Sequence, residues 1–155
     1  MNTKLDPTYL EAWRSFITTH AMLINHIDKS LNAAGQIPLH WYDVLIELYE
    51  APEQRLRMHE LADAVVLSRS GLTRLVNRLE KAGLLRRELD EADRRGFYAI
   101  ITDAGIDAMR SAWPVYAAGI QQYFADHLTK DEAKLLTRVF MQMMHYTKVH
   151  EADDE

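Results

Sequence analysis

Apolar side chains recur at steps of three and four residues over most of the chain, a spacing that predicts a mainly helical protein. The first such stripe lies between Asp6, a predicted N-cap followed by Pro7, and Gly35, which stands where a helix would have just ended. Its members are Trp13, Ile17, His20, Ile24, Ile27 and Leu31. We therefore expect one long N-terminal helix, followed by a shorter one over residues 38–49.

The middle of the chain predicts shorter helices and strands. Two helices fit residues 58–65 and 69–81, with the short separation typical of a helix-turn-helix. Ser68 is the expected N-cap of the second helix, and Gly83 the expected left-handed residue after it. Two strand-like runs, 84–88 and 97–102, then enclose a charged segment. This pattern predicts a hairpin with a charged tip, and residues 50–55 are expected to form a loop.

The last third of the chain predicts two more helices. Thr102 is expected to cap a helix that runs to about residue 127 and bends at Pro114, while Thr129 and Glu132 form a capping box for a helix that runs to about residue 150. The long helices at both ends of the sequence carry more apolar surface than a central region of about fifty residues can cover. We therefore expect a homodimer that pairs through them.

The amino-acid composition excludes several kinds of site and segment. The 155 residues contain no cysteine, which excludes disulfides, thiolate metal sites and cysteine nucleophiles. No run of about 18 apolar residues occurs and the first residues are polar, so we expect a cytoplasmic protein without a membrane segment. The net charge is -5, but residues 55–95 hold ten Lys and Arg against seven Asp and Glu, which is +3 and leaves -8 elsewhere. The positive charge is concentrated in the middle.

The helix expected over residues 69–81 has two chemically different faces. Leu72, Leu75, Val76 and Leu79 define an apolar face, so the polar side chains must point outward. These outward residues are Arg69, Ser70, Thr73, Arg74 and Asn77. Arginine can bond guanine with two donors and asparagine can bridge an adenine edge, so this face suits the major groove of DNA. By itself, the pattern also fits an ordinary solvated helix.

The hairpin tip carries Asp93, Arg94 and Arg95 between the two strands. An arginine at such a tip can enter the narrow, electronegative minor groove, and we expect Arg95 to do so while Asp93 orients it. A charged turn without a role is the alternative, but such a turn does not need this pairing.

The run from Leu61 to Gly105 resembles the MarR (multiple antibiotic resistance regulator) family. The resemblance is carried by Leu61-Ala62, Ser68, Thr73 to Val76, Arg78 to Leu84, Asp90, Asp93 to Arg95, Thr102 and Gly105. It implies a winged helix-turn-helix, mainly α with a small β-hairpin wing, in a single domain over 1–155. Residues 38–102 would form the DNA-binding lobe, with 1–35 and 103–150 supplying the dimerisation helices. It also implies a palindromic duplex operator, wing contacts from Asp93 and Arg95, and recognition-helix contacts from Ser68, Arg69, Ser70, Thr73 and Arg74; Arg78 would support a phosphate contact or packing.

The resemblance further implies a repressor released by a small aromatic or phenolic effector. Candidate ligand residues are Trp13, Arg14, His20, Trp41 and Tyr42, which together could supply aromatic stacking and a cation. Ordinary packing in the core or at an interface is the more common role for any one of these aromatic side chains. The histidine spacing is poor for a metal site, and we expect no metal and no cofactor. No catalytic motif is present, so we expect no enzyme. A winged helix that binds protein, or a DNA-binding regulator without an effector, are the alternative functions.

Overall fold

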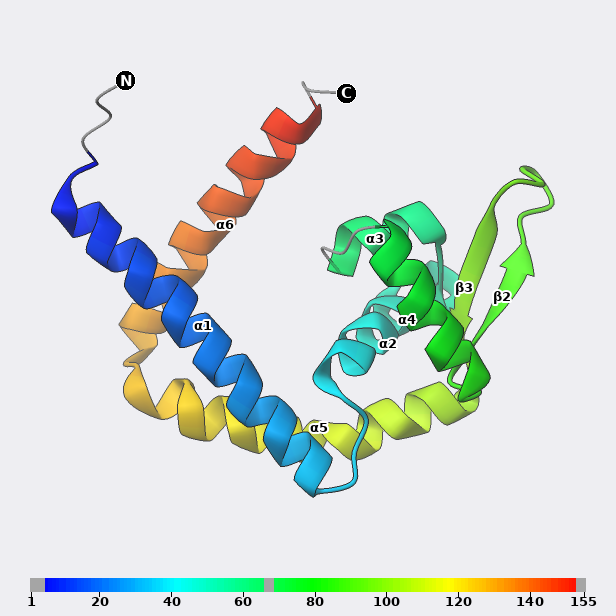
Figure 1. Ribbon diagram of the computed structural model, residues 1–155, viewed down its shortest axis with the longest axis horizontal. Coiled ribbons are helices and arrows are strands. Elements are labelled where there is room, and N and C mark those ends of the chain that lie inside the picture. Colours follow the sequence, from blue (N-terminus) through cyan, green and yellow to red (C-terminus); the bar gives the residue numbers. More distant parts are fainter. Residues whose placement is uncertain (1–4, 66–68, 153–155) are drawn as a thin grey trace. The chain divides into compact units, whose positions relative to one another are not determined.

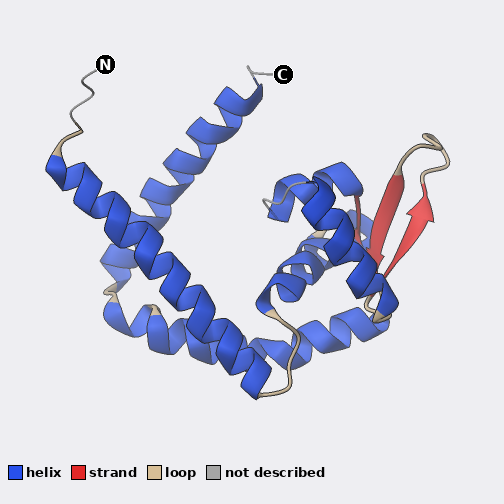
Figure 2. Cartoon of the chain, viewed as in Figure 1, coloured by secondary structure: helices blue, strands red, loops and turns tan. Residues whose placement is uncertain are grey.

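The computed structural model describes residues 5–65 and 69–152, with the backbone alone for residues 69, 70 and 150–152. Within these ranges the chain is mostly helical with one small sheet (Figure 2). Its internal contacts divide it into two compact units, Met1–Ala117 and Ala118–Glu155. Among the described residues, no helix has the length and apolar content needed to cross a membrane.

The first unit begins with α1 (Pro7–Ala33), whose start is set as the sequence predicts. Asp6 accepts a hydrogen bond from the backbone N–H of Thr8 at 2.8 Å, Pro7 occupies the first turn, and Gly35 follows the helix with φ of +67°. Of the predicted apolar stripe, only Ile27 and Leu31 are buried in this chain. The outer part of the stripe is exposed.

Helix α2 (Leu39–Glu50) is connected to α1 by a side chain. Pro38 has no side-chain donor or acceptor to cap α2, and Asp28 of α1 instead accepts a hydrogen bond from the backbone N–H of Leu39 at 2.9 Å. A 3-10 turn (Pro52–Gln54) and strand β1 (Arg55–Arg57) follow. The prediction of a simple loop there was incomplete, because β1 contains only three residues and is held by pairing with a distant strand rather than by a local pattern.

The predicted helix-turn-helix is present as α3 (Met58–Val65) and α4 (Arg69–Lys81), which lie side by side in Figure 1. The proposed N-cap Ser68 lies outside the described residues. Gly83 follows α4 with φ of +76°, as predicted. Strands β2 (Leu85–Leu89) and β3 (Phe97–Ile101) form the predicted hairpin, and β1 pairs with the other edge of β3, giving an antiparallel sheet of order β1-β3-β2.

The core of this unit is built from α1, α2, α3, α4 and the hairpin. Its fully buried larger side chains are Leu31, Val44, Leu45, Leu48, Leu61, Leu72, Val76, Leu79 and Leu85. Burying one such side chain contributes about 1.5–3 kcal/mol, so the set supplies much of the stability that holds α4 in place.

Helix α5 (Asp103–Tyr123) starts in the first unit and contains Pro114 in its interior. The predicted helix to about residue 127 was too long, because Phe124 leaves helical geometry (φ -127°, ψ -60°) and residues Ala125–His127 form a separate 3-10 turn. Helix α6 (Lys130–Ala152) forms most of the second unit. The predicted capping box is confirmed: Thr129 N–H donates to Glu132 at 2.8 Å, and Glu132 N–H donates to the Thr129 hydroxyl oxygen at 3.2 Å.

The start of α5 is packed against the turn that ends α4. Thr102 donates its hydroxyl hydrogen to the carbonyl of Gly83 at 2.6 Å, and its hydroxyl oxygen accepts from Gly105 N–H at 3.1 Å. A Cβ on Gly105 would lie 2.1 Å from the carbonyl oxygen of Leu84. Only glycine therefore fits at this joint between α5 and the α4–β2 turn.

We expect Gly105→Ala to lower the free energy of unfolding by about 1–3 kcal/mol, because the new methyl group displaces backbone rather than a flexible side chain. Urea denaturation followed by circular dichroism measures it. Ala104→Ser, a change at the exposed neighbouring position, is the control and should cost less than about 0.5 kcal/mol. Equal stability of the Gly105→Ala and wild-type chains would show that the first turn of α5 is free to shift.

Candidate nucleic-acid interface

The polar face of α4 is oriented by its apolar face. Leu72, Leu75, Val76 and Leu79 are all buried, with Leu75, the most accessible of them, 6% exposed. The predicted outward residues whose side chains are described are exposed: Thr73, Arg74, Asn77 and Arg78. Nothing is described for the side chains of Arg69 and Ser70. The exposed face thus offers hydroxyl, guanidinium and amide groups along one side of α4.

An ion pair links the last turn of α4 to the hairpin. The backbone N–H of Arg87 in β2 donates to Glu80 at 3.1 Å, and its guanidinium donates to the same carboxylate at 2.9 and 3.3 Å. These hydrogen bonds hold the pKa of the Glu80 carboxyl below its usual range. Glu80 and Arg87 were not predicted as functional residues, since their contact depends on how the hairpin packs on α4.

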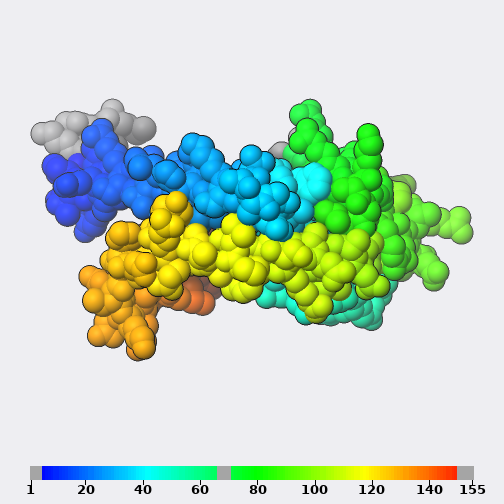
Figure 3. Space-filling model, turned by 90° about the horizontal axis from the view of Figure 1, so that it is seen from below, coloured from blue at the N-terminus to red at the C-terminus, as the bar shows by residue number. Residues whose placement is uncertain are grey.

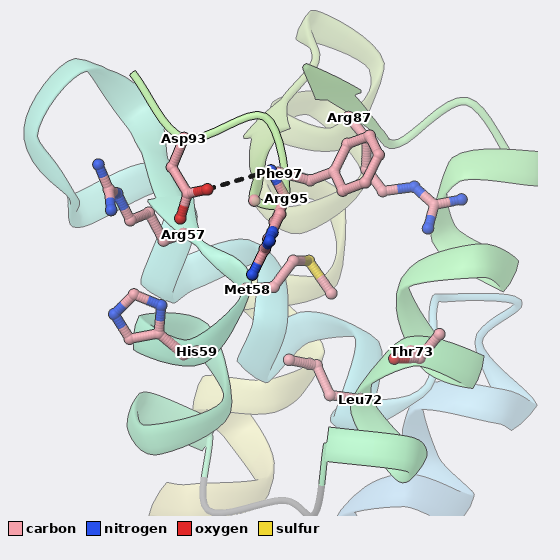
Figure 4. Close-up of a pocket in the computed structure, with 10 residues that line it drawn as sticks. Arg57, Met58, His59, Leu72, Thr73, Arg87, Asp93, Arg95 and Phe97 are labelled. Carbon is pink, nitrogen blue, oxygen red and sulfur yellow. Dashed lines mark hydrogen bonds between the residues drawn. The ribbon is translucent and has the colours of Figure 1, made fainter. Parts of the chain in front are cut away.

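The tip of the hairpin carries the predicted wing residues. Asp93, Arg94 and Arg95 are all exposed, and the tip projects away from the rest of its unit (Figure 3). The Asp93 carboxylate accepts a hydrogen bond from the backbone N–H of Arg95 at 3.1 Å, drawn as the dashed line in Figure 4. In the free chain Asp93 therefore fixes the backbone at Arg95, while an effect on the Arg95 guanidinium stays a prediction.

A cleft of about 490 Å³ lies between the helix-turn-helix and the hairpin (Figure 4). Leu72 and Thr73 of α4 line it, as do Asp93, Arg95 and Phe97 of the hairpin. Three arginines and one histidine contribute to its walls: Arg57, Arg87, Arg95 and His59. Thr73 of the polar face of α4 and Arg95 of the hairpin tip therefore line the same basic cleft, so one extended anion can touch both elements.

The candidate ligand residues fall into two groups of ring contacts. Tyr42, which is 6% exposed, stacks on Trp113 at 6.4 Å and meets Tyr116 edge-on at 5.0 Å. On α1, the ring centre of Trp13 lies 6.2 Å from that of Phe16, and the ring centre of Phe16 lies 6.4 Å from that of His20. Arg14 is exposed and Trp41 is half-buried.

Trp113 and Tyr116 were missed as ligand candidates, although they belong to the apolar stripe that predicts α5. Burial is the main reason why the pKa values of the Tyr42 and Tyr116 hydroxyls are raised, and Asp43 raises that of Tyr116 further. Both phenols are therefore neutral hydrogen-bonding groups at neutral pH. In the described part of the chain, no three His, Asp or Glu side chains gather in a way that would hold a metal ion.

Comparison with known proteins agrees with this architecture. A sequence profile of the MarR family matches residues 36–96. YkoM, an HTH-type transcriptional regulator of Bacillus subtilis, is 32% identical over 123 residues, covering 79% of this chain and 77% of YkoM.

Two solved structures from Streptomyces coelicolor are similar over nearly the whole chain. AbsC, a MarR family transcriptional regulator, superposes with a TM-score of 0.85 at 31% identity, covering 95% of this chain and 99% of AbsC. Sco3205, a MarR family transcriptional regulator solved in complex with DNA, also gives a TM-score of 0.85, at 35% identity, covering 93% of this chain and 90% of Sco3205. With a winged helix-turn-helix, a matching family profile and relatives above 30% identity along most of its length, this chain is a transcriptional regulator of the MarR family.

Proposed function

We propose that the protein is a homodimeric repressor that binds a palindromic duplex operator and is released by a small aromatic or phenolic effector. The observation that carries the DNA-binding part is the basic cleft bordered by both α4 and the hairpin tip. A duplex presents its major groove, a phosphate backbone and the next minor groove side by side. A helix and a wing that share one cleft are arranged to address all three.

On α4, the exposed Thr73, Arg74 and Asn77 have the groups that distinguish bases in the major groove. Arg78, one turn later, is suited to the phosphate backbone. In the sequence, Ser68 directly precedes α4, and Arg69 and Ser70 are its first two residues. The N-terminal end of a helix favours a phosphate through the helix dipole, and we propose contacts for these three residues on sequence position alone.

On the wing, Arg94 and Arg95 are exposed guanidinium groups on a narrow projecting hairpin. A guanidinium is attracted into a narrow minor groove by the enhanced negative potential there. We assign Arg95 to this groove, because it lines the cleft shared with α4. Asp93 supports it by bonding its backbone amide.

The effect of Arg74→Ala on DNA binding should show whether Arg74 reads a base or contacts a phosphate. Arg74→Ala should cost about 1–3 kcal/mol at one operator position if its guanidinium reads a base edge, whereas uniform weakening with a lower salt slope would assign Arg74 to phosphate.

The wing gives a second prediction. Arg95→Ala should weaken binding about ten-fold or more, and Asp93→Ala should weaken it less, because Arg95 supplies the positive charge in the groove and Asp93 only orients it. Fluorescence anisotropy with a duplex selected by the wild-type chain from a randomised library measures both.

Lys81→Ala is the control, since it removes one exposed positive charge at the end of α4 without touching the proposed contacts. If the Arg74 and Arg95 variants both bound the selected duplex like wild type, this surface would not be the DNA interface. If the wild-type chain selected no duplex at all, the alternative of a winged helix that binds protein would be preferred.

Dimerisation is supported by the apolar faces of the long helices. On α1 the exposed apolar residues include Tyr9, Trp13, Ile17, Met22 and Ile24; on α6 they include Leu135, Met141, Met143, Met144 and Val149. Apolar faces of this extent are rare on monomers. A two-fold dimer would present two copies of α4, which requires a two-fold symmetric operator with half-sites about one helical turn apart.

We expect sedimentation equilibrium at micromolar concentration to give twice the chain mass of 17.9 kDa. Replacing Met141 and Met144 together with Glu should shift the population to monomer, because each introduces a charge into the paired apolar face. Glu at the exposed, already polar Gln122 of α5 is the control. A stable wild-type monomer would contradict the assembly and, with it, the palindromic operator.

The effector proposal rests on the aromatic cluster of Tyr42, Trp113 and Tyr116. Trp113 is 49% exposed, so a ring entering from solvent can stack on it. The carboxylate of Asp43, whose charge raises the pKa of Tyr116, would repel an anion there. Among aromatic effectors, this cluster therefore favours a neutral phenol over an aromatic carboxylate, while the Arg14 guanidinium on α1 would favour the acid.

Titration with phenol and with benzoate distinguishes the two groups of candidate residues. We expect phenol, and not benzoate, to quench tryptophan fluorescence and to release the labelled duplex, and Trp113→Leu to abolish both effects while leaving DNA affinity intact. Trp13→Leu is the matched variant on α1. Release by benzoate that depends on Trp13 would move the site to α1, and no release by either compound would favour a regulator without such an effector.

We propose no catalytic role and no cofactor, and we place the protein in the cytoplasm, where its DNA partner lies. The support is the function of the family rather than any feature of the chain that excludes other activities.

A further inference from the structure

Asp90 stands out among the described residues as a buried charged side chain, 5% exposed, in a position next to the wing tip. It directly follows the last residue of β2. One carboxylate oxygen accepts the N–H of Ala92 at 3.0 Å, and the backbone N–H of Asp90 donates to the carbonyl of Gly96 at 3.0 Å. Asp90 thus binds both sides of the loop that carries Arg95.

The other carboxylate oxygen of Asp90 faces Arg57, the last residue of β1. An Arg57 guanidinium nitrogen lies 2.6 Å away, and within the described ranges no aligned hydrogen-bond donor reaches this oxygen. A buried carboxylate is stable only when its charge is compensated, so Arg57 is what makes burial of Asp90 possible.

Arg57 is itself oriented by Tyr98 of β3. The Arg57 Nε–H donates to the Tyr98 hydroxyl oxygen at 3.1 Å, and the guanidinium carbon lies 5.5 Å from the centre of the Tyr98 ring. Tyr98 is also the residue paired with Arg57 across the strands. Ring and hydroxyl together hold the guanidinium toward Asp90.

The cluster of Arg57, Asp90 and Tyr98 lies where the three-stranded sheet ends, so it can support the part of the hairpin beyond β1. Arg57 pairs with Tyr98 at the end of β1, so beyond it the hairpin continues as two strands, with Leu89 paired to Phe97 as its last pair. A two-stranded ribbon has little stability of its own in water. The Arg57–Asp90 ion pair reaches past the end of β1 to the first residue of the tip loop.

We infer that Arg57 is a positioning residue for DNA binding, which holds the wing tip through Asp90 and Tyr98 so that Arg95 is presented to the minor groove. The inference rests on the proposed DNA contact of the wing. It adds a residue outside both the recognition helix and the wing, on a strand whose presence the sequence pattern did not indicate.

A direct phosphate contact is the competing role for Arg57, because it also lines the basic cleft and its side chain is 38% exposed. The two roles differ in what they predict for Asp90. Asp90→Asn removes a negative charge near DNA, so simple electrostatics predicts tighter binding. Loss of positioning predicts weaker binding, because Arg57 and the tip loop are no longer held together.

The test compares Arg57→Gln, Asp90→Asn and the double variant on the duplex selected by the wild-type chain. We expect each single change to weaken binding about ten-fold and the double change to weaken it no further, because both remove one interaction. Arg57→Lys should recover part of the affinity, since lysine keeps the charge. Arg86→Gln is the control: it removes the same charge from an exposed ion pair with Glu88 in the same sheet and should bind like wild type.

Two further readouts keep the outcomes apart. Hydrogen exchange of the Asp90 and Gly96 amides should be faster in the single variants, with circular dichroism unchanged. Tyr98→Phe, which removes only the hydroxyl acceptor, provides a milder variant if Arg57→Gln does not fold, and it should show a smaller loss in the same direction. The salt dependence of binding should keep its wild-type slope in Asp90→Asn.

Tighter binding by Asp90→Asn, or additive losses with a salt slope reduced by about one for Arg57→Gln, would overturn the positioning role in favour of a phosphate contact. Wild-type affinity of both single variants while Arg95→Ala binds poorly would overturn this inference alone. Wild-type affinity of Arg95→Ala would instead overturn the proposed contact of the wing with DNA, and the inference with it.

Discussion

Burial of the apolar face of α4 is the constraint from which the candidate interface follows. Leu72 and Leu79 lose almost all contact with water, and the helix cannot rotate without exposing them. The side chains on the other side of the helix, such as Thr73 and Arg74, are therefore forced outward. The chemistry offered to DNA is set by what the core excludes as much as by the polar residues themselves.

Contacts on both sides of the α4–β2 turn hold the neighbouring elements in a fixed position relative to α4. Glu80 of α4 binds the backbone and guanidinium of Arg87 in β2, which fixes the hairpin relative to the helix. Thr102 and Gly105 pack the start of α5 against Gly83 and Leu84 of the turn so closely that a methyl group has no room. A displacement of the start of α5 would therefore move the end of α4, which is the mechanical link that the proposed effector near Trp113 would need in order to influence the proposed DNA contacts.

Charge is used locally in this protein. The chain carries a net charge of -5, yet the cleft is lined by Arg57, Arg87 and Arg95. Two of these arginines also bind carboxylates, Glu80 and Asp90. Such ion pairs hold the guanidinium groups in place, but the carboxylates offset part of their positive charge. Arg95 is exposed and has no ion pair among the described residues. Of the three arginines it is therefore the best suited to the proposed insertion into the minor groove.

The sequence by itself determined which segments form helices and the hairpin, and several of the residues that cap the helices, because these depend on neighbours within a few positions. Asp6, Gly83 and the Thr129–Glu132 pair mark helix ends by local hydrogen bonds or backbone conformation. The two faces of α4 also follow from its own periodicity.

Only the tertiary structure decided which distant residues meet. Strand β1 has three residues and no periodicity to detect, and it exists because β3 pairs with it. The contact of Arg57 with Asp90, and that of Tyr42 with Trp113, join residues far apart along the chain. No local pattern encodes such contacts, since they result from packing whole elements around a shared core.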